Sequence, residues 1–152
     1  MGPIAEPTTP ILAELSRDEC LRLLGSAAVG RVVALTGVGH TPVIRPVNYV
    51  FDEVSQSVVF RCVPGTKLIT LLRAARAWFE VDEVDPVSRS GWSVIVSGVT
   101  EPVTERHEIR RLERLALHSW LAGPDARWIR IRSRVVSGRR VQASVAPTEE
   151  SG

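Results

Sequence analysis

The chain is built from short apolar runs, some alternating with polar residues, separated by turns rich in glycine, proline, aspartate and serine. Runs of this length between such turns are typical of β-strands. We expect six strands, at Arg31–Leu35, Thr41–Phe51, Ser57–Val63, Ala77–Val84, Gly91–Val103 and Trp128–Val136. They form no βαβ repeat. The predicted fold is therefore mainly β, an antiparallel sheet closed into a small six-stranded barrel, because closure removes exposed strand edges.

Three helices are predicted around these strands. Ser16 and Glu19 form a capping box at the start of the first, which ends near Gly25. The second is capped by Thr66 and runs to about residue 75, and the third spans residues 104–120. The third is amphipathic, with a charged side expected to face water, made of Arg110, Arg111, Glu113 and Arg114.

A chain of 152 residues fits one domain and can bury a core without a disulfide or metal. We expect a flexible arm over residues 1–13, a barrel domain over 14–143 and a polar tail over 144–152. Cys20 and Cys62 are isolated and are expected as free, buried thiols. No leader pattern and no apolar run near the ~20 residues of a membrane span is recognisable, so a cytoplasmic protein without a membrane partner is expected.

The charge pattern argues against a nucleic-acid partner, because the net charge is only +2. Six arginines lie within residues 127–140. Alternation favours a strand with arginines turned to water, and phosphate binding is the alternative. Pro42 and Pro46 cannot donate to a sheet ladder, so their strand is expected to be an edge or bulged beside them.

The strongest local signal is Gly65-Thr66-Lys67, which follows a strand and opens a helix. Lys67 is the one lysine among 19 basic residues, and it stands where a helix N-terminus offers free N–H groups. A glycine lets the backbone approach a ligand closely, and the hydroxyl of Thr66 adds a donor. With Arg61 at the strand end, this pattern favours an anion site, although threonine is also simply a good helix cap.

Other chemistries find no support in the sequence. His40, His107 and His118 have no metal-ligand spacing and no cysteine pair beside them, so no metal is expected. No Gly-x-Ser-x-Gly elbow occurs, and Gly37-Val38-Gly39 opens no helix of a dinucleotide or P-loop fingerprint. We assign no catalytic side chain, since Tyr49 and His40 are better explained as structural residues.

An ordered set of segments carries a family resemblance over roughly residues 15–141. The segments are Val29-Gly30-Arg31, Pro46-Val47-Asn48-Tyr49, Phe60-Arg61 through Gly65-Thr66-Lys67, Phe79-Glu80-Val81-Asp82, Ser90 through Gly98, and Ser137-Gly138-Arg139. In this order they resemble the pyridoxamine 5′-phosphate oxidase-like superfamily of FMN-binding split barrels, in particular its short actinobacterial members. The resemblance implies a homodimer with two flavins at the subunit interface.

The resemblance also implies which residues bind the flavin. Thr66 and Lys67 match positions that grip the phosphate, with Phe60, Arg61 and Gly65 beside them. A strand running along the flavin ring is matched by Arg45, Pro46, Val47, Asn48 and Tyr49. Trp92 and Ser93 match positions near the flavin, often contributed by the partner subunit, although Trp92 could equally pack in the barrel. Arg139 matches a C-terminal arginine near the ring.

The function implied is an FMN-dependent oxidoreductase that transfers hydride or electrons to a small molecule. This chain lacks the arginine-rich C-terminal motif with a histidine found in full pyridoxamine phosphate oxidases, which argues against the vitamin reaction. A related branch binds the deazaflavin coenzyme F-420. Its polyglutamate tail favours a more extended basic groove, so FMN is preferred here. A flavin-binding protein without turnover is the remaining alternative.

Overall fold

The computed structural model describes residues 2, 9–35, 40–65, 72, 76–115 and 123–143. Its ordered elements are, in chain order, β1 (Ile11–Glu14), α1 (Arg17–Leu24), β2 (Val29–Leu35), β3 (Pro42–Asp52), β4 (Ser57–Cys62), β5 (Arg76–Asp85), β6 (Ser90–Pro102), α3 (Arg106–Glu113), β7 (Arg127–Arg132) and β8 (Val135–Gln142). The predicted second helix, from Thr66 to about residue 75, lies outside the described residues apart from Leu72.

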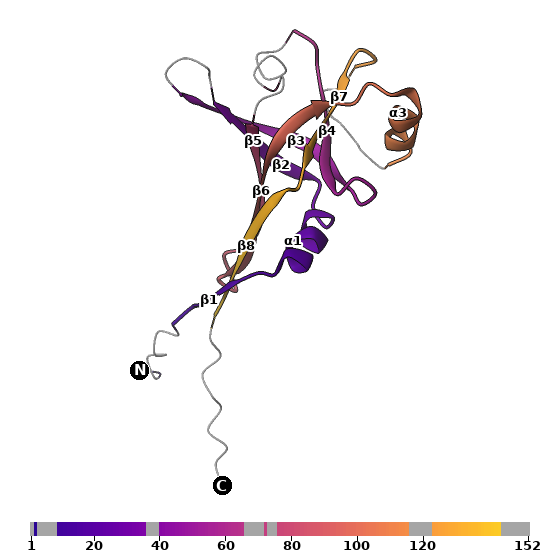
Figure 1. The fold of residues 1–152 in the computed structure, drawn as a ribbon. Helices are drawn as coiled ribbons and strands as arrows, with labels where there is room; N and C mark the ends of the chain where they lie inside the picture. The colour runs from indigo at the N-terminus through magenta and orange to yellow at the C-terminus, as the bar shows by residue number, and fades with distance from the viewer. Residues whose placement is uncertain are drawn as a thin grey trace.

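Six strands close into an antiparallel barrel in the order β6-β5-β2-β3-β4-β7, because β7 pairs back onto β6. The predicted six-stranded split barrel is therefore confirmed. β8 adds to β6 outside the closure, and β1 adds to β8. As a result β5, β6 and β8 run out of the barrel as a ribbon with β1 at its edge, while α3 lies beside β4 and β7 (Figure 1).

β3 changes partner along its length. Its residues Pro42–Asn48 pair with β2, and its residues Tyr49–Asp52 pair with β4. The first part is thus a sheet edge on its β4 side, as Pro42 and Pro46 predict. This divergence of β3 from β4 opens the sheet beside the point where β4 ends.

Two strand predictions need correction. Ile11–Glu14 pairs with Arg139–Gln142 of β8, so the last residues of the predicted arm belong to the sheet. The predicted strand 128–136 is two strands, because Ser133 and Arg134 interrupt it. There the hydroxyl and backbone N–H of Ser133 donate to the carbonyl oxygen of Gln56, and Arg17 donates to the carbonyl oxygen of Ser133. These contacts turn the chain from β7 into β8.

The described residues form two apolar clusters. The larger fills the barrel and includes the apolar side of α1, whose Ser16–Glu19 capping box is present as predicted. The smaller lies between the outside of the barrel and α3 and consists of Val59, Val103, Leu112 and Trp128. α3 therefore covers β4 and β7 on the face turned away from the main core, and β7 is buried on both faces.

Two arginine predictions fail because of this second layer. Arg111, expected to face water, forms a two-pronged ion pair with Asp52, at 2.7 and 2.8 Å. Arg130, expected on a solvated strand face, is only 4% exposed and pairs with Glu108 of α3 at 3.2 Å. The sequence pattern of each element alone did not reveal that the helix and strand pack against one another.

Candidate functional site

The segment Arg61–Gly65 leaves the barrel where β4 ends at Cys62. Gly65 has a φ of +81°, in the left-handed region that favours glycine, and a Cβ there would meet no atom within 4 Å. Thr66 and Lys67, the predicted phosphate-binding pair, lie outside the described residues. The structure thus defines the chain's approach to the predicted anion site, and the role of the two residues stays a prediction.

Arg61 lies over the ring of Trp128, its cross-strand partner on β7, with its guanidinium carbon 5.4 Å from the ring centroid. One Nη donates to the carbonyl oxygen of Gly123 at 3.4 Å. Among the described residues, the enclosed Nε of Arg61 has no hydrogen-bond partner. Leaving a buried donor unpaired costs on the order of 1–3 kcal/mol, and more for a charged group. This nitrogen is therefore suited to receive an acceptor from a ligand.

A cavity of about 590 Å³ adjoins this segment. Arg61, Pro64 and Gly65 line it, together with Trp128 of β7 and Ile109 of α3. The volume falls in the range of about 300–1,000 Å³ typical of small-molecule sites. The predicted anion-binding segment therefore borders a space large enough for a small organic ligand.

The predicted ring-side strand divides by side-chain direction. Val47 packs against the core, and Tyr49 is 2% exposed, with its hydroxyl donating to the carbonyl oxygen of Leu24 at 2.6 Å. Burial raises the pKa of Tyr49 above its usual range, so the phenol stays protonated and structural, as expected. Phe60 is fully buried, so only backbone atoms of Tyr49 and Phe60 can approach a ligand.

Three other residues of that strand lie nearer the surface. Arg45 and Pro46 are exposed, and Asn48 is half-buried. The β3–β4 pairing ends at Tyr49–Phe60, so Asn48 and Arg61 are the first residues beyond it, at the point where β3 leaves β4. The edge of β3 and the exit of β4 therefore meet at the candidate site.

Trp92, Ser93 and Arg139 come together elsewhere. Ser93 pairs with Arg139 across β6 and β8, and all three line a hollow of about 430 Å³ beside the β5–β6 hairpin. Asp82 and Arg89 also line this hollow. Trp92 packs partly against the barrel core, which agrees with the structural alternative for this residue.

The Trp92 group and the cavity beside Arg61 lie near opposite ends of β6. Trp92 is near its start, whereas Pro102, which lines the cavity of Arg61, is its last residue, ten residues further along. Ten residues of antiparallel strand measure about 33 Å along the chain. Within one chain, the predicted phosphate segment and the Trp92 group are therefore too far apart to hold the same small ring.

Sequence reasoning missed two residues of the cavity, Arg127 and Trp128. Both stand at the start of β7, opposite Cys62 and Arg61 of β4. The cluster of arginines from residue 127 onward was the available signal, but the pattern of one strand does not reveal which other strand it pairs with. The register between β4 and β7 decides this arrangement.

Two searches of the described residues complete the survey of the site. No group of three or more histidine, cysteine, aspartate or glutamate side chains is placed to hold a metal ion there. No described helix is long and apolar enough to cross a membrane. Cys20 and Cys62 are buried free thiols, as predicted, and burial raises the pKa of Cys62 to about 11.

The family model described as pyridoxamine 5′-phosphate oxidase matches residues 16–149. The chain belongs to this family. This match spans every described strand except β1, together with the Arg61–Lys67 segment and the Trp92 group. Among curated relatives, the uncharacterized protein Rv0080 of Mycobacterium tuberculosis is 34% identical over 137 residues, covering 87% of each chain.

Solved structures of the family agree with this fold. The FAD binding protein from Mycobacterium smegmatis is 35% identical and covers 85% of this chain and 97% of its own, with a TM-score of 0.73. A FAD-binding protein from Mesorhizobium loti is 26% identical and covers 88% and 99%, with a TM-score of 0.70. The split barrel is thus supported both by its topology and by solved relatives.

Proposed function

We propose that this family member binds a flavin, with the flavin phosphate at Arg61–Lys67, and serves as a flavin-dependent oxidoreductase acting on a small molecule. The observation that carries the proposal is the enclosed, unpartnered Nε of Arg61, next to the left-handed Gly65 at the exit of β4. It is supported by two solved relatives described as FAD-binding. The sequence favours FMN. FAD contains the same FMN moiety, including its phosphate.

The described residues fit a flavin phosphate in charge and in shape. Arg61 supplies a cation, Gly65 leaves the backbone open, and the β3 edge ends beside them. Thr66 and Lys67 would complete the phosphate contacts. The flavin, once bound, supplies the hydride or electron transfer itself. The chain's own residues then position it, and no described side chain is assigned as acid or base.

We further propose that the site is shared between two copies of the chain. In one chain the Trp92 group and the Arg61 cavity are separated by ten residues of β6, so Trp92, Ser93 and Arg139 would meet the flavin of the partner. An apolar outer sheet face is available for association. It carries Leu35, Ile44, Ile95 and Val99, with exposed fractions of 39, 54, 43 and 44%.

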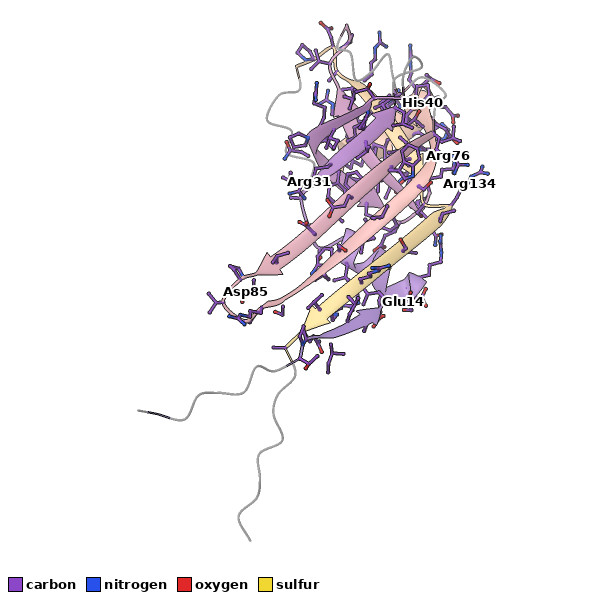
Figure 2. All side chains as sticks on the ribbon, turned by 90° about the vertical axis from the view of Figure 1, so that its left-hand side faces the viewer. Glu14, Arg31, His40, Arg76, Asp85 and Arg134 are labelled. Atoms are coloured by element: carbon purple, nitrogen blue, oxygen red, sulfur yellow. The ribbon has the colours of Figure 1, made fainter. Side chains whose placement is uncertain are left out.

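This face crosses four neighbouring strands. Val33 of β2 pairs with Ile44 of β3 and with Trp78 of β5, and Trp78 pairs with Ser97 of β6. Figure 2 looks onto this side of the sheet, with Arg31 and Arg76 labelled on it and Asp85 at the tip of the β5–β6 hairpin. Monomeric proteins rarely expose large apolar patches, so these four exposed side chains on neighbouring strands favour a partner surface here.

The cofactor is tested by the absorption spectrum of the purified protein and the mass of the molecule it releases. A flavin spectrum is expected, and mass separates FMN, FAD and the deazaflavin. Added flavin should also raise the melting temperature of cofactor-depleted protein. A colourless protein whose melting temperature does not respond would refute flavin binding. Turnover with a reduced nicotinamide donor and a range of acceptors separates an oxidoreductase from a binding protein.

Replacing Lys67 with alanine is expected to weaken flavin binding by about 10- to 100-fold, because a hydrogen bond to a charged group contributes about 1.5–3 kcal/mol. Flavin fluorescence titration measures this affinity. Arg110→Ala, on the exposed side of α3, is the matched loss of one cation and should leave affinity unchanged. Equal affinities of Lys67→Ala and the unmodified chain would remove Lys67 from the site.

Replacing Ile44 with lysine is expected to weaken self-association at least tenfold, because it puts a charge in the proposed apolar interface. Sedimentation over a concentration series measures the dimer constant. Val54→Lys is the control, since Val54 is 79% exposed in the turn between β3 and β4 and lies off this face. An unmodified chain that sediments as a monomer, or an Ile44 variant with unchanged association, would contradict the shared site.

A further inference from the structure

Two carboxylates lie on the outer sheet face through which dimerisation is proposed. Glu80 and Asp82 stand two residues apart on β5, so both side chains point to the same side of the sheet. Glu80 pairs with Arg31 of β2 on one side and with Ile95 of β6 on the other. Because Ile95 belongs to the exposed apolar set of this face, Glu80 lies within the proposed interface.

Arg31 is the cation that contacts both carboxylates among the described residues. One Nη of Arg31 lies 3.5 Å from a carboxylate oxygen of Glu80 and 3.3 Å from one of Asp82. The side chains of Arg31, Glu80 and Asp82 are 42, 29 and 39% exposed, so water still screens their charges in a single chain. On β6, the side chains nearest to Glu80 on this face are uncharged, namely Ser93, Ile95 and Ser97. With both carboxylates ionised, the cluster carries one net negative charge.

Other charged side chains of this face lie further from the cluster. Arg139 of β8 is separated from Asp82 by Ser93 of β6, and Arg76 stands four residues before Glu80 on β5. Exposed apolar side chains flank the cluster on both sides along the strands. They are Leu35, Ile44 and Val99 toward one end of the face, and Leu12, Val84 and Val141 toward the β5–β6 hairpin. The cluster is thus central on this face.

A second copy bound to this face would cover the cluster with its own equivalent. Two-fold dimers use the same patch on both subunits, and residues near the middle of the patch meet their counterparts. Two carboxylates from each chain would then face one guanidinium from each, with less water around them. Burial disfavours an ionised carboxyl, and so does a like charge nearby. In one chain, burial and the charge of Asp82 already raise the pKa of Glu80 above its ordinary value of 4.5, although Arg31 opposes this.

We propose that dimer formation takes up protons at the Glu80–Asp82 pair, so that a fall in pH favours assembly of the shared flavin site. The inference rests on the proposed function, because a second copy covers the pair only in the dimer. A proton from solvent, shared between the two carboxylates, leaves one negative charge, which Arg31 neutralises. Since the dimer then holds more protons than two separate chains, the association constant rises as the pH falls.

Sedimentation over a concentration series, at about pH 8 and about pH 5.5 and at constant ionic strength, measures this dependence. The unmodified chain should associate about tenfold or more tightly at the lower pH. Glu80→Gln removes the excess negative charge. It should associate at about pH 8 as tightly as the unmodified chain does at about pH 5.5, with less than about twofold change between the two conditions. Asp82→Asn should act in the same direction.

Two control variants separate this pair from other titrating groups. Glu83→Gln removes an exposed carboxylate on the opposite side of β5, and His40→Gln removes an exposed histidine before β3, so both should keep the pH dependence. A dimer whose association does not strengthen as the pH falls, or a Glu80→Gln variant with the full dependence, would overturn the proton uptake and leave the shared site intact. A chain that is monomeric at both pH values would overturn the shared site and this inference together.

Discussion

Replacing Asp52 with asparagine is expected to lower the free energy of unfolding by about 3 kcal/mol. The Asp52 carboxylate accepts two hydrogen bonds from Arg111, at 2.7 and 2.8 Å, one from the hydroxyl of Ser55 at 2.5 Å and one from the backbone N–H of Val54 at 3.3 Å. An amide in its place turns an N–H₂ group toward these donors and leaves Arg111 without its charge partner. Breaking a buried ion pair costs about 3–5 kcal/mol.

The lower end of that range applies because the two partners differ in burial. The side chain of Asp52 is 2% exposed, whereas that of Arg111 is 31% exposed and keeps part of its hydration. Urea unfolding measures the loss. Arg110→Ala, one residue away on the exposed side of α3, should change stability by less than about 0.5 kcal/mol. An Asp52→Asn variant that loses less than about 1 kcal/mol would show that the pair contributes little.

Ionisation of the Asp52 carboxylate should also make the free energy of unfolding depend on pH. Hydrogen bonding to Arg111 lowers the pKa of Asp52 from 3.8 to about 2. Because the folded-state pKa is below the unfolded one, the contribution is complete above about pH 5 and is lost as the pH falls through 4 toward 2. A shift of this size corresponds to about 2 kcal/mol. Urea unfolding at pH 6 and pH 3 should show about half of this loss, about 1 kcal/mol, in the unmodified chain and a smaller one in Asp52→Asn.

This ion pair also links stability to the candidate site. Asp52 ends β3, and Arg111 lies on α3, which carries Ile109 and Glu113 of the cavity wall. Arg130 of β7 joins the same helix through Glu108. Since these contacts hold α3 against the barrel, Asp52→Asn should loosen the cavity as well as the fold.

The parts of the structure that the sequence predicted are those set by local chemistry. The Ser16–Glu19 capping box depends on residues three apart, and the edge at Pro42 and Pro46 follows from a missing N–H. Strand positions follow from apolar runs between turns. Each of these signals is complete within a few neighbouring residues, so no knowledge of the rest of the chain is needed.

The parts that the sequence did not predict depend on contacts between distant residues. The break at Ser133 is stabilised by Gln56, and the alternating pattern of β7 continues through it unchanged. The pairing of Arg61 with Trp128 depends on the register of β4 against β7. The site could therefore be predicted at the segment that carries the anion signal, but not at the cavity that adjoins it.

Replacing Gly30 with alanine is expected to destabilise the barrel by about 3 kcal/mol, although it adds a single methyl group. That methyl would overlap the ring of Phe79, with Cε2 only 2.7 Å away, and would lie 2.9 Å from the backbone oxygen of Glu80 on β5. Overpacking a core typically costs about 1–3 kcal/mol. The upper end applies because neither neighbour has room to move.

The ring of Phe79 is fixed from the other side. It is fully buried, and it packs edge-on against Tyr49 with ring centroids 4.6 Å apart. Tyr49 is held in turn by its hydrogen bond to the carbonyl oxygen of Leu24. A shift of Phe79 would therefore disturb Tyr49 at the point where β3 changes partner. Gly30→Ala should then weaken flavin binding as well as stability, since Val47, opposite Gly30, belongs to the proposed ring-side strand.

Gly25→Ala provides the matched control for this prediction. Gly25 has a φ of −76°, and a methyl group there would come no closer than 3.5 Å to any atom outside its immediate neighbours, namely the carbonyl oxygen of Arg22. This variant should unfold within about 1 kcal/mol of the unmodified chain, because alanine adopts that conformation without strain. If the two variants proved equally stable in urea, Phe79 would have room to move, and the close packing of β2 on β5 would not be needed to position β3.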